Sequence, residues 1–166
     1  MNTKELQNFL HVNFEYKEGA LHYKNKISHK SKIGEKAGHL LNGYLITQIQ
    51  KITYRVHQLI FLYHHGYIPK IIDHIDRNPL NNNIENLREV TKSENGFNRG
   101  KNKNNTSKYK CVTYMKDKKK WKAYIKINGR QKHLGYFMAP ELAYEAYCKF
   151  VRANLPIYYL GEQYVN

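Results

Sequence analysis

Asp73 and His74 stand next to each other, and two asparagines follow at Asn86 and Asn95. A carboxylate and an amide oxygen are hard ligands suited to Mg²⁺, an ion that keeps several waters and binds phosphate oxygens. An adjacent imidazole can accept a proton from an attacking water. These residue types together indicate metal-assisted attack of water on a phosphate.

The elements that must position these side chains can be read from the same stretch. Residues 70–76 (KIIDHID) form a short β-branched run, residues 77–83 (RNPLNNN) are dense in turn formers, and residues 87–90 can return as an antiparallel strand. Strand alternation sends Asp73 and His74 to opposite faces, so a bulge or a strand end is needed for both to reach one phosphate. Thr91 or Ser93 is expected to cap a short helix that carries Asn95.

The stretch DHIDRNPLNNNIENLREVTKSEN, residues 73–95, resembles the HNH nuclease family of the phage and intron homing type. The motif folds there as a ββα-metal finger, and the resemblance covers residues 15–98. It implies that His74 is the general base, that Asp73 and Asn95 hold one divalent metal ion, and that Asn86 orients His74 through a hydrogen bond. The metal, Mg²⁺ or alternatively Mn²⁺, would stabilise the pentacovalent phosphate and the departing 3′ oxygen.

Two positions depart from that pattern. Many relatives have Gly where Arg77 stands, and the last metal position is Asn95 rather than His, as is typical of homing nickases. Other residues have plainer interpretations: Asn81, Asn82 and Asn83 as turn residues, and His57 as a packing or helix-surface residue. Asp73 as a turn cap and Asn86 as a loop-holding residue remain alternatives to their roles in the family.

The formal net charge of the 166-residue chain is +15, and most of it lies in one segment. Residues 99–133 contain 13 Lys and Arg and one acidic residue, Asp117, whereas residues 1–98 carry a net charge of +4. Such a segment favours nucleic acid as the binding partner, because lysines and arginines that neutralise phosphates release counterions. Membrane-surface binding would favour a basic amphipathic helix, and this segment alternates like strands. A solvated basic face that only aids solubility is the alternative.

After a polar segment at residues 100–107, the pattern predicts three strands and a helix. Asn128-Gly129 predicts a two-residue hairpin. The motifs KWKAYI and LGYF, within residues 109–150, resemble the plant ethylene-response-factor (Apetala-type) DNA-binding domain, which also occurs fused to phage HNH nucleases. In that family a three-stranded sheet lies in the major groove and a helix packs on its back.

Strand alternation places Trp121, Ala123 and Ile125 on the face that packs against the helix, and it places polar residues on the other face. Side chains on a sheet in the groove can read base edges, while lysines mostly hold phosphates. From alternation and the resemblance together, the predicted DNA contacts are Thr113, Met115, Lys122, Tyr124, Lys126, Arg130, Gln131 and His133.

We therefore expect an α+β protein with an HNH nuclease domain over residues 1–99, a linker over 100–107 and a DNA-binding domain over 108–166. The first is a ββα-metal finger with flanking N-terminal strands and a helix; the second is a three-stranded antiparallel sheet packed on one helix. The expected function is that of a metal-dependent, site-selective endonuclease acting on double-stranded DNA. The alternatives are a non-cleaving DNA-binding regulator with a degenerate nuclease module, and an RNA-directed role for the basic sheet.

The sequence argues against several other classes of protein. No apolar run approaches the roughly 18 residues that span a bilayer, and the N-terminus lacks a signal-peptide core. Cys111 and Cys148 fit neither a disulfide framework nor a CxxC zinc site. We expect a cytoplasmic protein without a membrane partner or a small-molecule cofactor.

One HNH finger attacks one DNA strand at a time, so a double-strand break would need two copies of the protein or sequential cuts.

Overall fold

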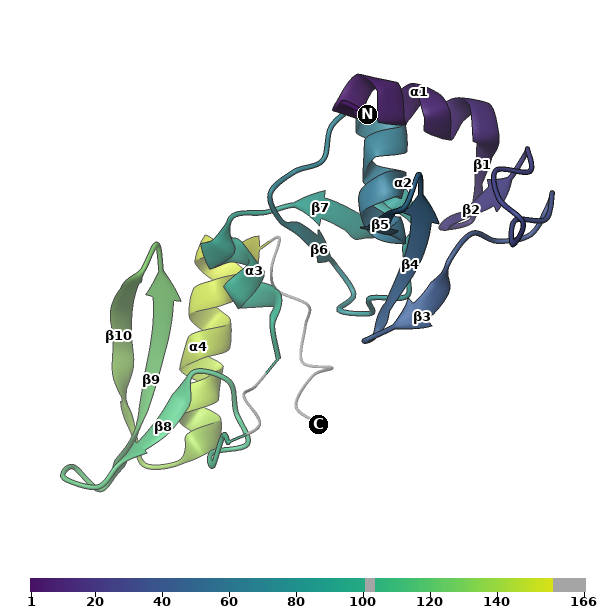
Figure 1. The fold of residues 1–166 in the computed structure, drawn as a ribbon. Coiled ribbons are helices and arrows are strands. Elements are labelled where there is room, and N and C mark those ends of the chain that lie inside the picture. Colours follow the sequence, from purple (N-terminus) through teal and green to yellow (C-terminus); the bar gives the residue numbers. More distant parts are fainter. Residues whose placement is uncertain (101–103, 157–166) are drawn as a thin grey trace. The chain divides into compact units, whose positions relative to one another are not determined.

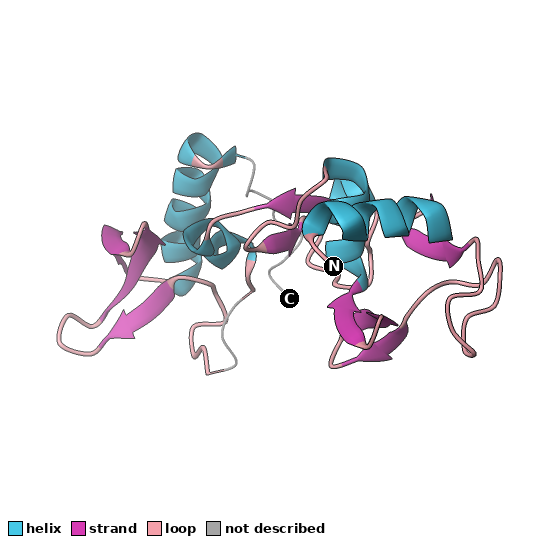
Figure 2. Cartoon of the chain, turned by 45° about the horizontal axis from the view of Figure 1, so that its top comes forward, coloured by secondary structure: helices cyan, strands magenta, loops and turns pink. Residues whose placement is uncertain are grey.

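The computed structural model describes residues 1–100 and 104–156 and divides the chain into two units, Met1–Thr91 and Lys92–Asn166 (Figure 1). Both units combine helices with small antiparallel sheets (Figure 2), which confirms the predicted α+β class. The second unit begins at Lys92, whereas the sequence pattern predicts the change at residues 100–107. Residues 101–103 of that linker and residues 157–166 of the predicted DNA-binding domain lie outside the described residues.

The first unit opens with helix α1 (Thr3–Asn13), which starts at a reciprocal capping box. Asn2 Oδ1 accepts the Glu5 N–H at 2.9 Å, and Glu5 Oε2 accepts the Asn2 N–H at 2.8 Å. Strands β1 (Phe14–Lys17) and β2 (Ala20–Tyr23) then form an antiparallel hairpin. Its turn is Glu18-Gly19, with φ of +46° and +75°.

A second sheet leads into the central helix of this unit. Strands β3 (His39–Leu41), β4 (Tyr44–Ile49) and β5 (Ile52–Arg55) pair antiparallel in chain order. Helix α2 (Val56–His65) follows without a break and ends at Gly66, which has φ of +81° and whose N–H donates to the Leu62 carbonyl. The left-handed conformation at the helix end explains the glycine there.

The core of the first unit forms around α2. Leu59, Ile60 and Leu62 of this helix are fully buried, and they belong to one apolar cluster with Leu10 of α1 and Phe14 of β1. Strands β6 (Ile72–His74) and β7 (Leu87–Glu89) pair antiparallel, and the 3₁₀ turn η1 (Ile84–Asn86) leads into β7. The β6–β7 pair therefore carries Asp73 and His74 beside a packed core.

The second unit contains helix α3 (Lys92–Asn98), strands β8 (Val112–Met115), β9 (Lys120–Ile127) and β10 (Arg130–Phe137), and helix α4 (Pro140–Asn154). The strands form an antiparallel sheet in the order β10-β9-β8, and α4 lies along it (Figure 1). Val112, Ala123 and Ala143 form the buried contact between sheet and helix. No helix within the described ranges 1–100 and 104–156 has the length and apolar character needed to cross a membrane.

Candidate functional site

Asp73 and His74 lie in β6, at the end of the strand, and each is only 7% exposed. Their cross-strand partners in β7 are Arg88 and Leu87. Directly opposed residues of an antiparallel pair point to the same face, so Asp73 lies beside Arg88 on one face and His74 lies on the other. The strand thus separates the carboxylate from the imidazole, as alternation predicts.

Asp73 forms a buried ion pair with Arg88. Arg88 Nε and Nη2 lie 3.0 and 2.8 Å from the same carboxylate oxygen, Oδ2, and the two side chains are 8% and 12% exposed. The guanidinium supplies the opposite charge and the donors that a buried carboxylate requires. Arg88 is absent from the residues predicted from sequence; its cross-strand position opposite Asp73 is the signal that could have found it.

His74 is oriented by Asn82, a residue whose type and neighbours predict only a turn. His74 Nε2 lies 3.0 Å from Asn82 Oδ1, and Asn82 is 2% exposed. An amide oxygen can only accept, so Nε2 donates in this bond, and in the neutral tautomer of the ring Nδ1 is the acceptor nitrogen. The Asn82 Nδ2 atom is buried and has no hydrogen-bond partner among the residues that the structure describes. An imidazole in this tautomer accepts a proton at Nδ1.

Asn86 instead holds the loop that carries Asn82. Its Nδ2 donates to Asp76 Oδ1 at 2.9 Å and to the Asn81 carbonyl at 2.7 Å, and its Oδ1 accepts the Asp76 N–H at 3.0 Å. The predicted hydrogen bond to His74 is thus made by Asn82, and these bonds of Asn86 fit the loop-holding alternative.

Asp76 is the centre of this loop. Its carboxylate accepts the Asn78 N–H at 2.8 Å and Asn81 Nδ2 at 2.7 Å, in addition to the Asn86 amide. Burial acts to raise the pKa of Asp76, but the hydrogen bonds from Asn78, Asn81 and Asn86 outweigh it and lower that pKa. Arg77 adopts φ of +64°, a left-handed conformation that suits glycine better than a residue with a side chain.

His57 of α2 packs directly on the ring of His74. The two ring centroids are 5.1 Å apart with an interplanar angle of 86°, and His57 is 5% exposed. Burial lowers the pKa of His57 to about 4, with smaller contributions from His74 and Arg55. His57 is therefore neutral near pH 7, and its packing role, expected from the sequence, is exerted on His74.

Asn95 lies on α3, which belongs to the second unit. This helix is fixed by Lys110, whose Nζ donates to the carbonyls of Gly96, Phe97 and Arg99 at 2.5 to 3.1 Å. A lysine at the end of a helix satisfies carbonyls that lack partners within the helix. The contacts that position Asn95 thus include a residue that follows the predicted linker.

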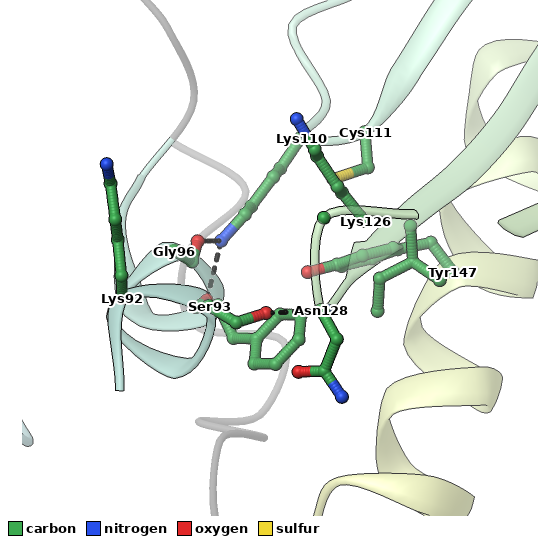
Figure 3. Close-up of a pocket in the computed structure, with 11 residues that line it drawn as sticks. Lys92, Ser93, Gly96, Lys110, Cys111, Lys126, Asn128 and Tyr147 are labelled. Carbon is green, nitrogen blue, oxygen red and sulfur yellow. Dashed lines mark hydrogen bonds between the residues drawn. The ribbon is translucent and has the colours of Figure 1, made fainter. Parts of the chain in front are cut away.

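A pocket of about 550 Å³ separates α3 from the sheet of the second unit (Figure 3). One wall is α3, with Lys92 and Phe97, and the other is formed by the β9–β10 hairpin and by Tyr147 of α4. The two walls are joined where the Asn128 N–H donates to Ser93 Oγ at 3.0 Å. This pocket is lined by three lysines, Lys92, Lys110 and Lys126, over an apolar floor.

The predicted DNA contacts, with one exception, share the open face of the β8–β9–β10 sheet. The cross-strand pairs on this face join Thr113 to Lys122, Tyr124 to His133 and Lys126 to Gln131, and Met115 follows Thr113 two residues later. Arg130 pairs with Ile127, which places it on the face that α4 covers. Within the described strands, the open face carries Lys120, Lys122 and Lys126 and no acidic residue.

Comparison with known proteins gives two matches. Residues 54–97, from β5 to α3, match a family of HNH endonucleases. The chain is also 41% identical over 68 residues to protein 3.8 of Escherichia phage T7, an alignment that covers 40% of this chain and 56% of the phage protein. The match thus spans little more than half of that relative. No solved structure matches the chain.

Proposed function

We propose that the protein is a metal-dependent DNA endonuclease of the homing type, because residues 54–97 match the HNH endonuclease family. His74 is the general base, and Asp73 and Asn95 are the metal ligands. The observation that carries the proposal is the buried His74–Asn82 hydrogen bond of 3.0 Å next to the buried Asp73 carboxylate. It supports the proposal because it gives the imidazole the tautomer that a base needs.

The donor set fits one divalent cation of the Mg²⁺ type. Asp73 offers a carboxylate and Asn95 an amide oxygen, both hard ligands, and Mg²⁺ is commonly bound by one or two carboxylates together with water and phosphate. Across residues 1–100 and 104–156, no three His, Cys, Asp or Glu side chains gather as they do at zinc sites. When bound, the metal would offset the charge that develops on the phosphate and on the departing 3′ oxygen. We propose Mg²⁺, with Mn²⁺ as a substitute.

His74 acts on the nucleophile. A water molecule loses a proton to His74 Nδ1 as its oxygen attacks the phosphorus, and the bond to the 3′ oxygen breaks. His74 becomes an imidazolium, and its Nε2–H then makes a stronger, charge-assisted hydrogen bond to Asn82 Oδ1. Asn82 is a positioning residue in this step, and Asn86 supports it through the loop.

Arg88 contacts Asp73 on the face of the β6–β7 pair opposite to His74. Its two hydrogen bonds to Asp73 Oδ2 hold the carboxylate in one orientation within a mostly buried setting. A carboxylate that is fixed before the metal arrives loses less conformational freedom when it binds. We therefore propose that Arg88 prepares Asp73 for the metal.

The second unit supplies DNA affinity and site choice in this proposal. Its sheet carries lysines and polar side chains on one face, and the motifs LGYF and KWKAYI support a likeness to the ethylene-response-factor domain. Lysines on this face would contact phosphates, and Thr113, Gln131 and His133 would reach base edges. Duplex DNA is the proposed partner.

The alternative is a DNA-binding regulator whose nuclease module no longer cleaves. The presence of Asp73, His74 and Asn95 together argues against it. Incubation of supercoiled plasmid with the protein and Mg²⁺ decides between them, with EDTA as the control. Endonuclease activity predicts nicked or linear plasmid with Mg²⁺ and none with EDTA. Plasmid that is bound but intact at all Mg²⁺ and Mn²⁺ concentrations would support the regulator.

A further inference from the structure

The turn of the β1–β2 hairpin lies directly against the loop that carries Asn82. A Cβ atom built on Gly19 would lie 2.7 Å from the Asn83 backbone nitrogen and 3.1 Å from the Asn82 carbonyl carbon. These are backbone atoms, so a side chain on Gly19 could fit only if the Asn82–Asn83 peptide moved. Gly19 is thus required both for its φ of +75° and for this close approach.

Tyr16 of the same hairpin holds the other end of this peptide segment. Its hydroxyl accepts the Ile84 N–H at 3.0 Å. The Tyr16 ring meets His64 of α2 edge to face, with 4.5 Å between centroids, and it packs against the main apolar cluster. The hydroxyl is therefore carried by a ring that is itself fixed to the core helix.

The loop needs such support because its own residues provide little packing. Residues 76–83 are mostly polar, and Arg77 is held in a left-handed conformation. Polar loops with few apolar contacts open locally at low free-energy cost. The hairpin contacts Asn83 and Ile84, the two residues that follow Asn82.

We propose that the β1–β2 hairpin is a positioning element for the His74–Asn82 pair, acting through Gly19 and Tyr16. Gly19 sets the position of the Asn82–Asn83 peptide by contact, and Tyr16 fixes Ile84 by a hydrogen bond. The positioning of the His74 ring by the hairpin is a property of the folded chain alone. The consequence for DNA cleavage rests on the proposed function.

The test compares Gly19→Ala with Gly43→Ala. Gly43 occupies the same place in the β3–β4 turn, where Asn42 and Gly43 have φ of +49° and +81°, close to the +46° and +75° of Glu18 and Gly19. A Cβ on Gly43 would meet nothing within 4 Å. Both variants carry a similar backbone strain, and only Gly19→Ala presses on the Asn82 loop.

Two readouts are measured on the full chain. The first is the long-range ¹H–¹⁵N spectrum of the His74 ring, assigned with His74→Gln, which reports the imidazole tautomer without DNA or metal. The second is the single-turnover cleavage rate at saturating DNA. We expect Gly19→Ala to change the His74 signals and to slow cleavage at least about tenfold, since a misplacement of about 1 Å can cost about a hundredfold. Gly43→Ala should leave both unchanged.

Tyr16→Phe keeps the ring and removes only the hydroxyl, so it tests the proposal even if Gly19→Ala does not fold. It should shift the His74 signals in the same direction by a smaller amount. Unaltered His74 signals in Tyr16→Phe, or in a folded Gly19→Ala, would overturn the positioning role. Altered His74 signals in a protein whose wild type cleaves no DNA would leave this inference standing and remove the proposed function instead.

Discussion

His74 Nε2 lies 3.0 Å from Asn82 Oδ1, eight residues further along the chain, and both side chains are buried. The bond joins the end of β6 to a loop whose polar side chains bond mainly to one another. It fixes which imidazole nitrogen carries the proton. The neighbouring Asp73–Arg88 pair fixes the carboxylate in a similar way on the opposite face.

Asn82→Leu should slow cleavage while leaving DNA binding intact. Leu has a similar volume and no acceptor, so the His74 ring loses the partner that selects its tautomer. General-base catalysis contributes about 100- to 10,000-fold, and we expect a loss of about 10- to 100-fold in the single-turnover rate at saturating DNA. Asn82→Asp keeps an acceptor oxygen and is the matched control. Equal rates for wild type and Asn82→Leu would contradict the role of Asn82.

Arg88→Met should destabilise the first unit. It leaves the Asp73 carboxylate, 8% exposed, without its guanidinium partner, and removal of one member of a buried ion pair costs about 3–5 kcal/mol. Urea unfolding measures the loss. The double variant Arg88→Met with Asp73→Asn should recover part of it, because no charge then stays buried. Lys17→Met, which breaks an exposed pair with Glu15, is the control, and a similar small effect in both single variants would refute the prediction.

His57 should make the protein less stable in mild acid. Its pKa is lowered from 6.5 to about 4 by burial, so between these values the unfolded state binds the proton and the folded state does not. Stability is therefore complete above pH 6.5 and falls toward pH 4 by about 1.4 kcal/mol per pH unit from this residue. The difference in unfolding free energy between wild type and His57→Phe, measured from pH 7.5 to 4.5, isolates that slope. Parallel pH curves for the two proteins would count against a neutral, buried His57.

Lys126→Ala and Lys132→Ala should differ in their effect on DNA binding. Both remove one exposed positive charge, but Lys126 pairs with Gln131 on the open face, whereas Lys132 pairs with Ile125 on the face toward α4. Removal of a phosphate-binding lysine from the open face should lower the slope of log Kd against log salt by about 1. Titration of a fluorescent duplex at several salt concentrations measures this slope. The same reduced slope in both variants would mean that charge alone, rather than the open face, binds DNA.

The sequence predicts those elements that local patterns determine. The hairpins at Glu18-Gly19 and Asn128-Gly129, and the end of α2 at Gly66, follow from residues that favour a left-handed backbone. The adjacent Asp73 and His74 could also be singled out, because few other interpretations explain that pair with two spaced asparagines.

Long-range contacts set the features that local patterns do not reveal. Asn82 is of a residue type that is typical of turns, and only the path of the loop brings it to His74. Strand alternation leaves either Arg130 or Gln131 for the groove face, and the register with Ile127 puts Arg130 on the other side. Likewise, the sequence pattern places α3 at the end of the first domain. The hydrogen bonds that Lys110 donates to the carbonyls of this helix become evident only in the folded chain.

Replacement of His74 by Ala tests whether this histidine is the general base of a DNA endonuclease. Supercoiled plasmid is incubated with wild type and His74→Ala at equal concentration in Mg²⁺, and duplex binding is measured in parallel with Ca²⁺ in place of Mg²⁺. We predict that wild type produces nicked or linear DNA and that His74→Ala leaves the plasmid intact while binding the duplex with unchanged Kd. Cleavage by His74→Ala at the wild-type rate would contradict the account.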